Sequence, residues 1–261
     1  MAVDFDAIKR KLDQLSGNNR KTSSNWRPQE GEEYAVRLLS FPDNDGQPFK
    51  EQWFYYNIGN NRGILAPYQF GKPDPFQELI TKLRDEGTKE SYELAKKLYP
   101  KMRCYAPVLV RGEEDKGVRI WGFGKMVYQS LLNVMLDEDY GDITDPLNGR
   151  DVKVICTRQP GRKWATTEVR PRGKESKLAE NPEEVSNLIS SIPDLGEMHE
   201  LKSYDELSKI INDWLNGDID SDTEGSGSTP AGASGDSDSE TTDTDSKSYK
   251  NLDDAFADLM D

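Results

Sequence analysis

Apolar and polar residues alternate along six short stretches of the chain. The stretches are 33–41, 51–58, 104–111, 117–123, 151–157 and 163–170, and several of them are joined by glycine, aspartate or asparagine turns. Alternation with period two is typical of strands that bury one face. The sequence therefore predicts a mostly antiparallel sheet of short strands.

Apolar residues at helical spacing lie between and after these stretches. The first two expected helices carry Phe76, Leu79, Ile80 and Leu83, and then Tyr92, Ala95 and Leu98 behind a Thr88 cap, and a third runs from Met126 to Leu136. Two later helices have marked starts, namely Asn181 followed by Pro182, and a capping box from Ser203 to Glu206. We expect a mainly β protein with helical insertions, in which an OB-fold core fits the order of elements and a β-sandwich fits almost as well.

The two ends of the chain differ from this middle part. Phe5, Ile8, Leu12 and Leu15 make one apolar helical face beside the basic residues Lys9, Arg10 and Lys11. This start is not the basic-then-apolar pattern of a secretory signal, and no apolar run is long enough to span a bilayer, so we expect an intracellular protein. Residues 217–248 are rich in Gly, Ser, Thr and Asp and are predicted to be disordered. In the last twelve residues Leu252, Phe256 and Leu259 recur at helical spacing, which predicts a short helix that forms on binding a partner.

Charge is distributed unevenly. The chain has 34 Lys and Arg against 48 Asp and Glu, a net charge of −14. Residues 20–178 hold 27 basic against 23 acidic side chains, whereas residues 216–261 hold 2 against 13. This asymmetry indicates that the middle of the chain binds a polyanion and that the C-terminal part is an acidic appendage.

Three of the expected strands place an aromatic residue and an arginine on the same, polar face. Period two groups Tyr105 with Arg111, then Arg119 with Trp121 and Phe123, and then Arg162 with Trp164 and Arg170. Single-stranded nucleic acid requires this pairing, because cations track its phosphates and aromatic rings stack on its unpaired bases. Further cations expected in the same groove are Lys101, Arg103, Lys125, Arg158, Lys163 and Arg172.

The same inventory argues against catalysis and metal binding. Two cysteines, Cys104 and Cys156, and one histidine, His199, are too few for a four-ligand zinc site, and a lone histidine makes a catalytic triad unconvincing. Arg119 stands where a phosphate-cradling loop ending at residues 124–125 requires glycine. The acidic stretch 137–145 is interpreted as a solvated loop. We therefore expect a binding protein without a cofactor.

Several segments, in their order and spacing, resemble the T-even-phage-type single-stranded DNA-binding proteins, also called helix-destabilising proteins. The similar segments are IKRKLDQLSGN, WRPQEGEEYAVRLLSFPDNDGQPF, YAPVLVRGEEDKGVRIWGFGKMVYQSLLNVM, LKSYDELSKIINDWLNG and LDDAFADLMD. The family's best-studied member binds zinc through one histidine and three cysteines, but residues 57–83 here contain neither residue type. The chain thus resembles a zinc-free branch, as in phages of cyanobacteria, and Phe76, Leu79, Ile80 and Leu83 are expected to pack where a metal would otherwise hold the subdomain.

The resemblance implies a specific organisation. Residues 1–24 correspond to a basic arm for cooperative binding, in which Lys9, Arg10 and Lys11 match the family's basic cluster. Residues 25–215 correspond to an OB-fold core with a helical subdomain at about 66–100, in which Tyr105, Trp121 and Trp164 stand where the family has DNA-stacking aromatics. Residues 216–261 correspond to an acidic tail that recruits replication and recombination proteins.

The expected activity is cooperative coating of single-stranded DNA, with little sequence preference, during phage replication, recombination and repair in the cytoplasm of an infected bacterium. Self-association along the DNA and tail-bound proteins are the expected partners, without a membrane. Two other functions stay open: an RNA-binding regulator with the same aromatics, and a protein-interaction adaptor that binds no nucleic acid.

Overall fold

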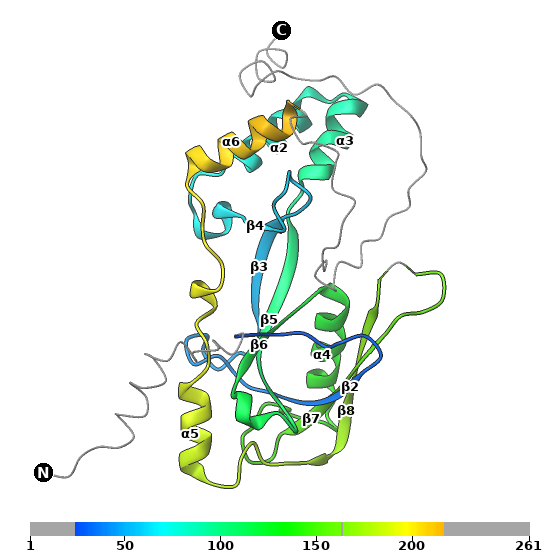
Figure 1. Cartoon of the computed structure of the whole chain (residues 1–261), viewed down its shortest axis with the longest axis vertical. Helices are drawn as coiled ribbons and strands as arrows, with labels where there is room; N and C mark the ends of the chain where they lie inside the picture. Colours follow the sequence, from blue (N-terminus) through cyan, green and yellow to red (C-terminus); the bar gives the residue numbers. More distant parts are fainter. Residues whose placement is uncertain (1–23, 163, 217–261) are drawn as a thin grey trace, which may run out of the picture.

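The computed structural model describes residues 24–162 and 164–216. In this part of the chain eight strands form one sheet, in the order β1, β6, β5, β2, β7, β8, with β3 paired to β5 and β4 paired to β3 (Figure 1). The strands are β1 (Asn25–Trp26), β2 (Glu33–Leu38), β3 (Lys50–Tyr55), β4 (Ile64–Leu65), β5 (Lys101–Val110), β6 (Arg119–Phe123), β7 (Arg150–Thr157) and β8 (Thr166–Glu175). β1 runs parallel to β6, and the other pairs are antiparallel. The prediction of a mainly β protein with helical parts is confirmed.

Helices cover part of the sheet and form a separate subdomain at one end of it. They are α2 (Pro75–Glu86), α3 (Lys89–Leu98), α4 (Lys125–Leu136), α5 (Pro182–Ser190) and α6 (Tyr204–Leu215), with short 3-10 turns η1 (Pro67–Phe70), η2 (Glu114–Lys116) and η3 (Leu195–Glu197). Every helix predicted within the described residues is present. Thr88 caps α3 and the Ser203–Glu206 capping box opens α6, as predicted, whereas Asn181 precedes α5 without a side-chain cap bond.

The main core lies between one face of the sheet and α4. Val36, Val108 and Val154 from three neighbouring strands are fully buried there, together with Leu131 of α4. The opposite face of β5 and β6 is also covered, because the chain after β8 returns over it. Leu195 of η3 packs into the cluster on that face. Both faces of these two strands are consequently covered by apolar residues where these two clusters lie.

A second core holds the helical subdomain, which stands at the far end of the long β3–β5 ladder (Figure 1). The predicted apolar face of α2 is 0–2% exposed, and Leu207 and Ile211 of α6 pack into the same core. Asp74 organises its base: its carboxylate accepts hydrogen bonds from the Tyr55 hydroxyl (2.8 Å) and from the first-turn amide of Phe76 (3.0 Å). Apolar packing and this buried carboxylate are thus the contacts that hold the subdomain.

Candidate nucleic-acid interface

The exposed aromatic face predicted for residues 119–123 is wrong. Trp121 and Phe123 are only 1% and 2% exposed, and the Trp121 ring lies edge-on to Trp26 with 5.4 Å between ring centroids. The predicted alternation is correct, since Ile120 points to the other face, but Ile120 is fully buried as well. Period two tells which side chains share a face and not whether another element covers it. Neither ring is available to stack on a base.

Two arginines predicted to bind phosphates are instead committed to internal ion pairs. Arg119 is 9% exposed and donates to Glu113 at 2.6 Å. Arg111 donates to both carboxylate oxygens of Asp151 at 3.2 Å and to the backbone carbonyls of residues 177–178. The open, phosphate-facing position predicted for Arg111 and Arg119 is therefore wrong, because Arg119 is held by Glu113 and Arg111 fastens the chain that leaves β8.

Tyr105 is buried too, but its surroundings are informative. Its ring, 7% exposed, packs against Phe54 and His199, so the predicted open stacking surface is absent. The ring lies flat over Gly122 of β6, where an added Cβ would come within 2.8 Å of it. Arg103 crosses to the same glycine and donates to its carbonyl oxygen at 3.0 Å. Tyr105 thus brings its hydroxyl to the site where Arg103 lies.

We call Arg27, Tyr56, Arg103 and Tyr105 the arginine–tyrosine cluster. Burial raises the pKa of both tyrosines, and for both of them Arg103 and Arg27 act in the opposite direction. The hydroxyls therefore stay protonated at neutral pH and can donate hydrogen bonds beside two guanidinium groups. Arg27 is exposed and Tyr56 and Arg103 are half-buried, so these three side chains can offer donors to a phosphate. Sequence analysis missed Arg27 and Tyr56, because Arg27 follows a strand of only two residues and nothing in the pattern brings Tyr56 to it.

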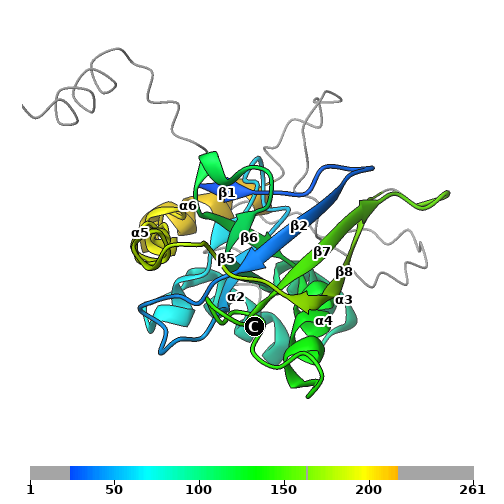
Figure 2. The ribbon, with the colours of Figure 1, turned by 90° about the horizontal axis from the view of Figure 1, so that it is seen from below.

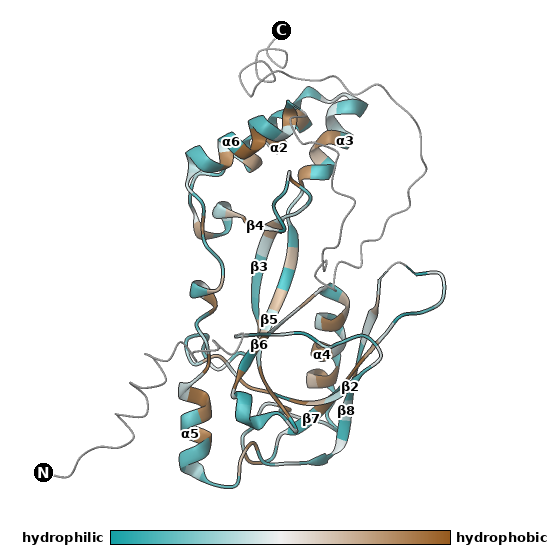
Figure 3. Cartoon of the chain, in the orientation of Figure 1, coloured by the Kyte–Doolittle hydropathy of each residue, from teal (hydrophilic) through white to brown (hydrophobic). Residues whose placement is uncertain are grey.

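The connection between β7 and β8 supplies an exposed aromatic ring. Trp164 is 43% exposed, and Arg162 and Arg158 are exposed on the same loop, which is hydrophilic at its tip (Figure 3). Arg158 pairs with Glu30 at 2.6 Å, which ties the loop to the segment that follows β1. Lys163 lies outside the described residues. The expected combination of arginine and tryptophan is therefore present and solvent-accessible here.

The predicted alternation along β8 is also present. Val169 is buried and Arg170 is exposed on the opposite side, where it pairs with Glu168 at 2.8 Å. Arg172 is exposed as well. Viewed from below, β7 and β8 lie at the opposite side of the sheet from β1 and β6 (Figure 2). The exposed cations of β8 are thus not adjacent to the arginine–tyrosine cluster.

Other predicted residues have simpler outcomes. Lys101 opens β5 and Lys125 opens α4, and both side chains are exposed. The basic residues Lys9, Arg10 and Lys11 lie outside the described residues. So do the tail-tip residues Leu252, Phe256 and Leu259, and nothing here tests their predicted roles.

The acidic stretch 137–145 forms turns. Asp142 accepts hydrogen bonds from the Thr144 amide (2.9 Å) and hydroxyl (2.7 Å), and Asp145 accepts two backbone amides at 2.7 Å. Across residues 24–162 and 164–216, no group of three or more His, Cys, Asp or Glu side chains could hold a metal ion. Within the same ranges no helix has the length and apolar character needed to cross a bilayer.

Comparison with known proteins gives no family assignment. No protein-family model matches the chain, and no curated protein matches it.

Proposed function

We propose that this chain binds single-stranded DNA through an OB-fold barrel and acts by coating the strand rather than by catalysis. The connectivity supports this proposal. β2 pairs with both β5 and β7, β5 pairs with β6, β7 pairs with β8, and α4 connects β6 to β7. Taken as strands one to five, β2, β5, β6, β7 and β8 follow a partly open Greek-key barrel.

OB-folds bind oligonucleotides on the face of their second and third strands and with the loop between the fourth and fifth. In this assignment β5 and β6 are the second and third strands, and β5 carries Arg103 and Tyr105 of the arginine–tyrosine cluster. The loop between the fourth and fifth strands is the β7–β8 loop with Trp164 and Arg162. The observation that carries the proposal is that the β7–β8 connection exposes Arg162 and Trp164 together, while the β5–β6 pair holds Arg103 beside the buried Tyr105.

This chemistry favours single strands over duplex. Unpaired bases gain roughly 1–3 kcal/mol each from stacking on an aromatic ring, and duplex bases are already stacked. Preferential binding to single strands lowers duplex stability by mass action. The chain also has a basic N-terminal arm and an acidic tail. We therefore propose that it acts in replication, recombination and repair of phage DNA. It would cover the DNA strand cooperatively and with little sequence preference.

The test is a salt series of oligothymidine binding by the full chain, followed by fluorescence anisotropy of labelled DNA. Each phosphate neutralised on a single strand contributes about −0.7 to the slope of log affinity against log salt concentration. Arg27→Ala combined with Arg103→Ala should weaken binding and make that slope shallower by about 0.7, because both arginines are proposed to bind the same phosphate. Lys209→Ala, an exposed cation on α6, is the matched control and should leave binding unchanged.

Equal effects of the cluster and control variants would contradict the proposed site. Absence of any oligothymidine binding at low salt would contradict the function itself. A competition between DNA and RNA of matched sequence completes the test, and RNA winning it would assign the same surface to an RNA-binding regulator.

A further inference from the structure

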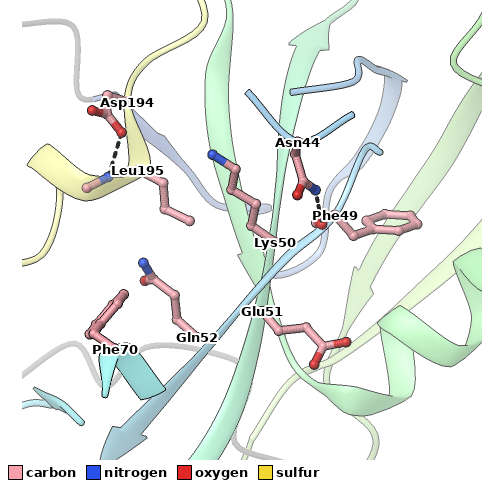
Figure 4. Close-up of a pocket in the computed structure, with 9 residues that line it drawn as sticks. Asn44, Phe49, Lys50, Glu51, Gln52, Phe70, Asp194 and Leu195 are labelled. Atoms are coloured by element: carbon pink, nitrogen blue, oxygen red, sulfur yellow. Dashed lines mark hydrogen bonds between the residues drawn. The ribbon is translucent and has the colours of Figure 1, made fainter. Parts of the chain in front are cut away.

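A cavity of about 550 Å³ lies beside β3, between η1 and η3 (Figure 4). Lys50 and Gln52 of β3 line it, together with Phe70, the last residue of η1. Asp194 and Leu195, at the start of η3, line its other side. Segments far apart in sequence thus build one hollow. It is widely open to solvent, and its volume lies in the range of small-ligand sites.

Gln52 is the most unusual group in this cavity. The residue is 8% exposed, and its amide oxygen is buried without a hydrogen-bond partner among the described residues. Figure 4 shows the amide standing between Phe70 and Leu195. An acceptor withdrawn from water without a donor is costly, so a turn of the Gln52 amide into the cavity, where a ligand offers it an N–H group, is favoured.

The other walls restrict what that ligand can be. Phe70 is 50% exposed and presents a flat apolar ring at the edge of the cavity. Lys50, the cation that lines the cavity, is already paired with Asp43 at 2.5 Å, and Asp194 adds a carboxylate on the η3 side, so the cavity does not favour a phosphate. The ligand should therefore offer an N–H to Gln52, present a flat face to Phe70 and carry no negative charge. An unpaired nucleobase is a neutral, planar group with an N–H at its edge.

The cavity adjoins the proposed DNA interface. Gln52 is the direct cross-strand partner of Arg103, and Lys50 is the partner of Tyr105. Neighbouring strands lie about 4.8 Å apart. If a DNA phosphate binds the arginine–tyrosine cluster, the DNA passes the cavity at about the distance between two neighbouring β-strands. One of its bases can then reach the cavity.

We infer that this cavity is a nucleobase subsite: one base of the bound strand turns in, stacks on Phe70 and donates an N–H to the Gln52 amide oxygen. The inference rests on the proposed function. It is compatible with low sequence preference, because each of the four bases carries an N–H donor on its Watson–Crick edge.

The experiment compares oligothymidine with an oligomer of N3-methylthymidine, which has the same ring and backbone but no imino N–H. The full chain should bind the unmodified oligomer about threefold to tenfold more tightly, the range expected for one neutral hydrogen bond. Gln52→Leu should remove this discrimination. Phe70→Ala should weaken binding of both oligomers, and Phe70→Tyr should restore it.

Equal discrimination by wild-type chain and Gln52→Leu would overturn the subsite while leaving the proposed function intact. Failure of every variant and the wild type to bind either oligomer would instead overturn the proposed function. Because Gln52→Leu changes a buried side chain, NMR of the wild-type chain gives an independent reading. The side-chain amide signal of Gln52 should shift when oligothymidine is added, and an unmoved signal under saturating DNA contradicts the subsite.

Discussion

Trp164→Ala and Trp121→Ala are expected to damage the protein in two different ways. Both tryptophans stand where the sequence resemblance places DNA-stacking rings, but Trp164 is 43% exposed on the β7–β8 loop and Trp121 is 1% exposed in the main core. Trp121 packs against Trp26 and, at 4.6 Å between ring centroids, against Phe123. The first substitution therefore removes a binding surface, and the second removes part of the core.

The magnitudes follow from these positions. Truncating a buried tryptophan costs about 3–5 kcal/mol of unfolding free energy, out of the roughly 5–15 kcal/mol of a typical domain. Losing one stacked base costs about 1–3 kcal/mol of binding, or about 5- to 150-fold in affinity. Trp164→Ala should therefore keep its stability within about 1 kcal/mol and lose affinity, whereas Trp121→Ala should unfold at much lower urea concentration.

Urea titration followed by circular dichroism measures stability without depending on tryptophan fluorescence. Anisotropy of labelled oligothymidine, recorded where both variants are folded, measures affinity. If folded Trp121→Ala loses as much affinity as Trp164→Ala, or if Trp164→Ala binds like the wild type, the assignment of the binding surface to the loop is refuted.

Two further predictions concern stability. Asp74→Ala should lower the unfolding free energy by about 2–4 kcal/mol in urea titration, because it removes the α2 cap and leaves the buried Tyr55 hydroxyl unpaired, and a loss below 0.5 kcal/mol contradicts the role of this carboxylate. Burial lowers the pKa of His199 below its ordinary value of 6.5, so the unfolded chain takes up more protons in mild acid and the unfolding free energy should fall as the pH drops below about 6.5. Urea titrations at pH 7.5 and 5.5 should show a smaller drop for His199→Leu than for wild type, and an equal drop contradicts the assignment to this residue.

Local patterns predicted the elements well, because their signals are short-range. The Thr88 cap and the Ser203–Glu206 capping box lie within four residues of the helices they open, and both form as expected. The strands were predicted by alternation, except β1 and β4, whose two residues each are too short to alternate.

The candidate site was only partly predictable. Trp164, Arg162 and Arg158 lie on one connection between β7 and β8, so their clustering follows from the local sequence. Arg27 and Tyr56 join Arg103 only through the parallel pairing of β1 with β6 and the antiparallel pairing of β3 with β5. Strand pairing between distant segments leaves no local signature, so these two residues were missed.

By itself, the sequence determined where strands and helices form, which side chains share a face of each strand, and that cations gather in the middle of an acidic chain. Only the tertiary structure decided which faces are open to solvent. The chain after β8 covers the outer face of β5 and β6, and α4 covers the inner one, which buries Trp121 and Tyr105 while Trp164 stays exposed. The physical reason is that periodicity depends on the nearest few residues, whereas exposure depends on whatever distant segment packs on top.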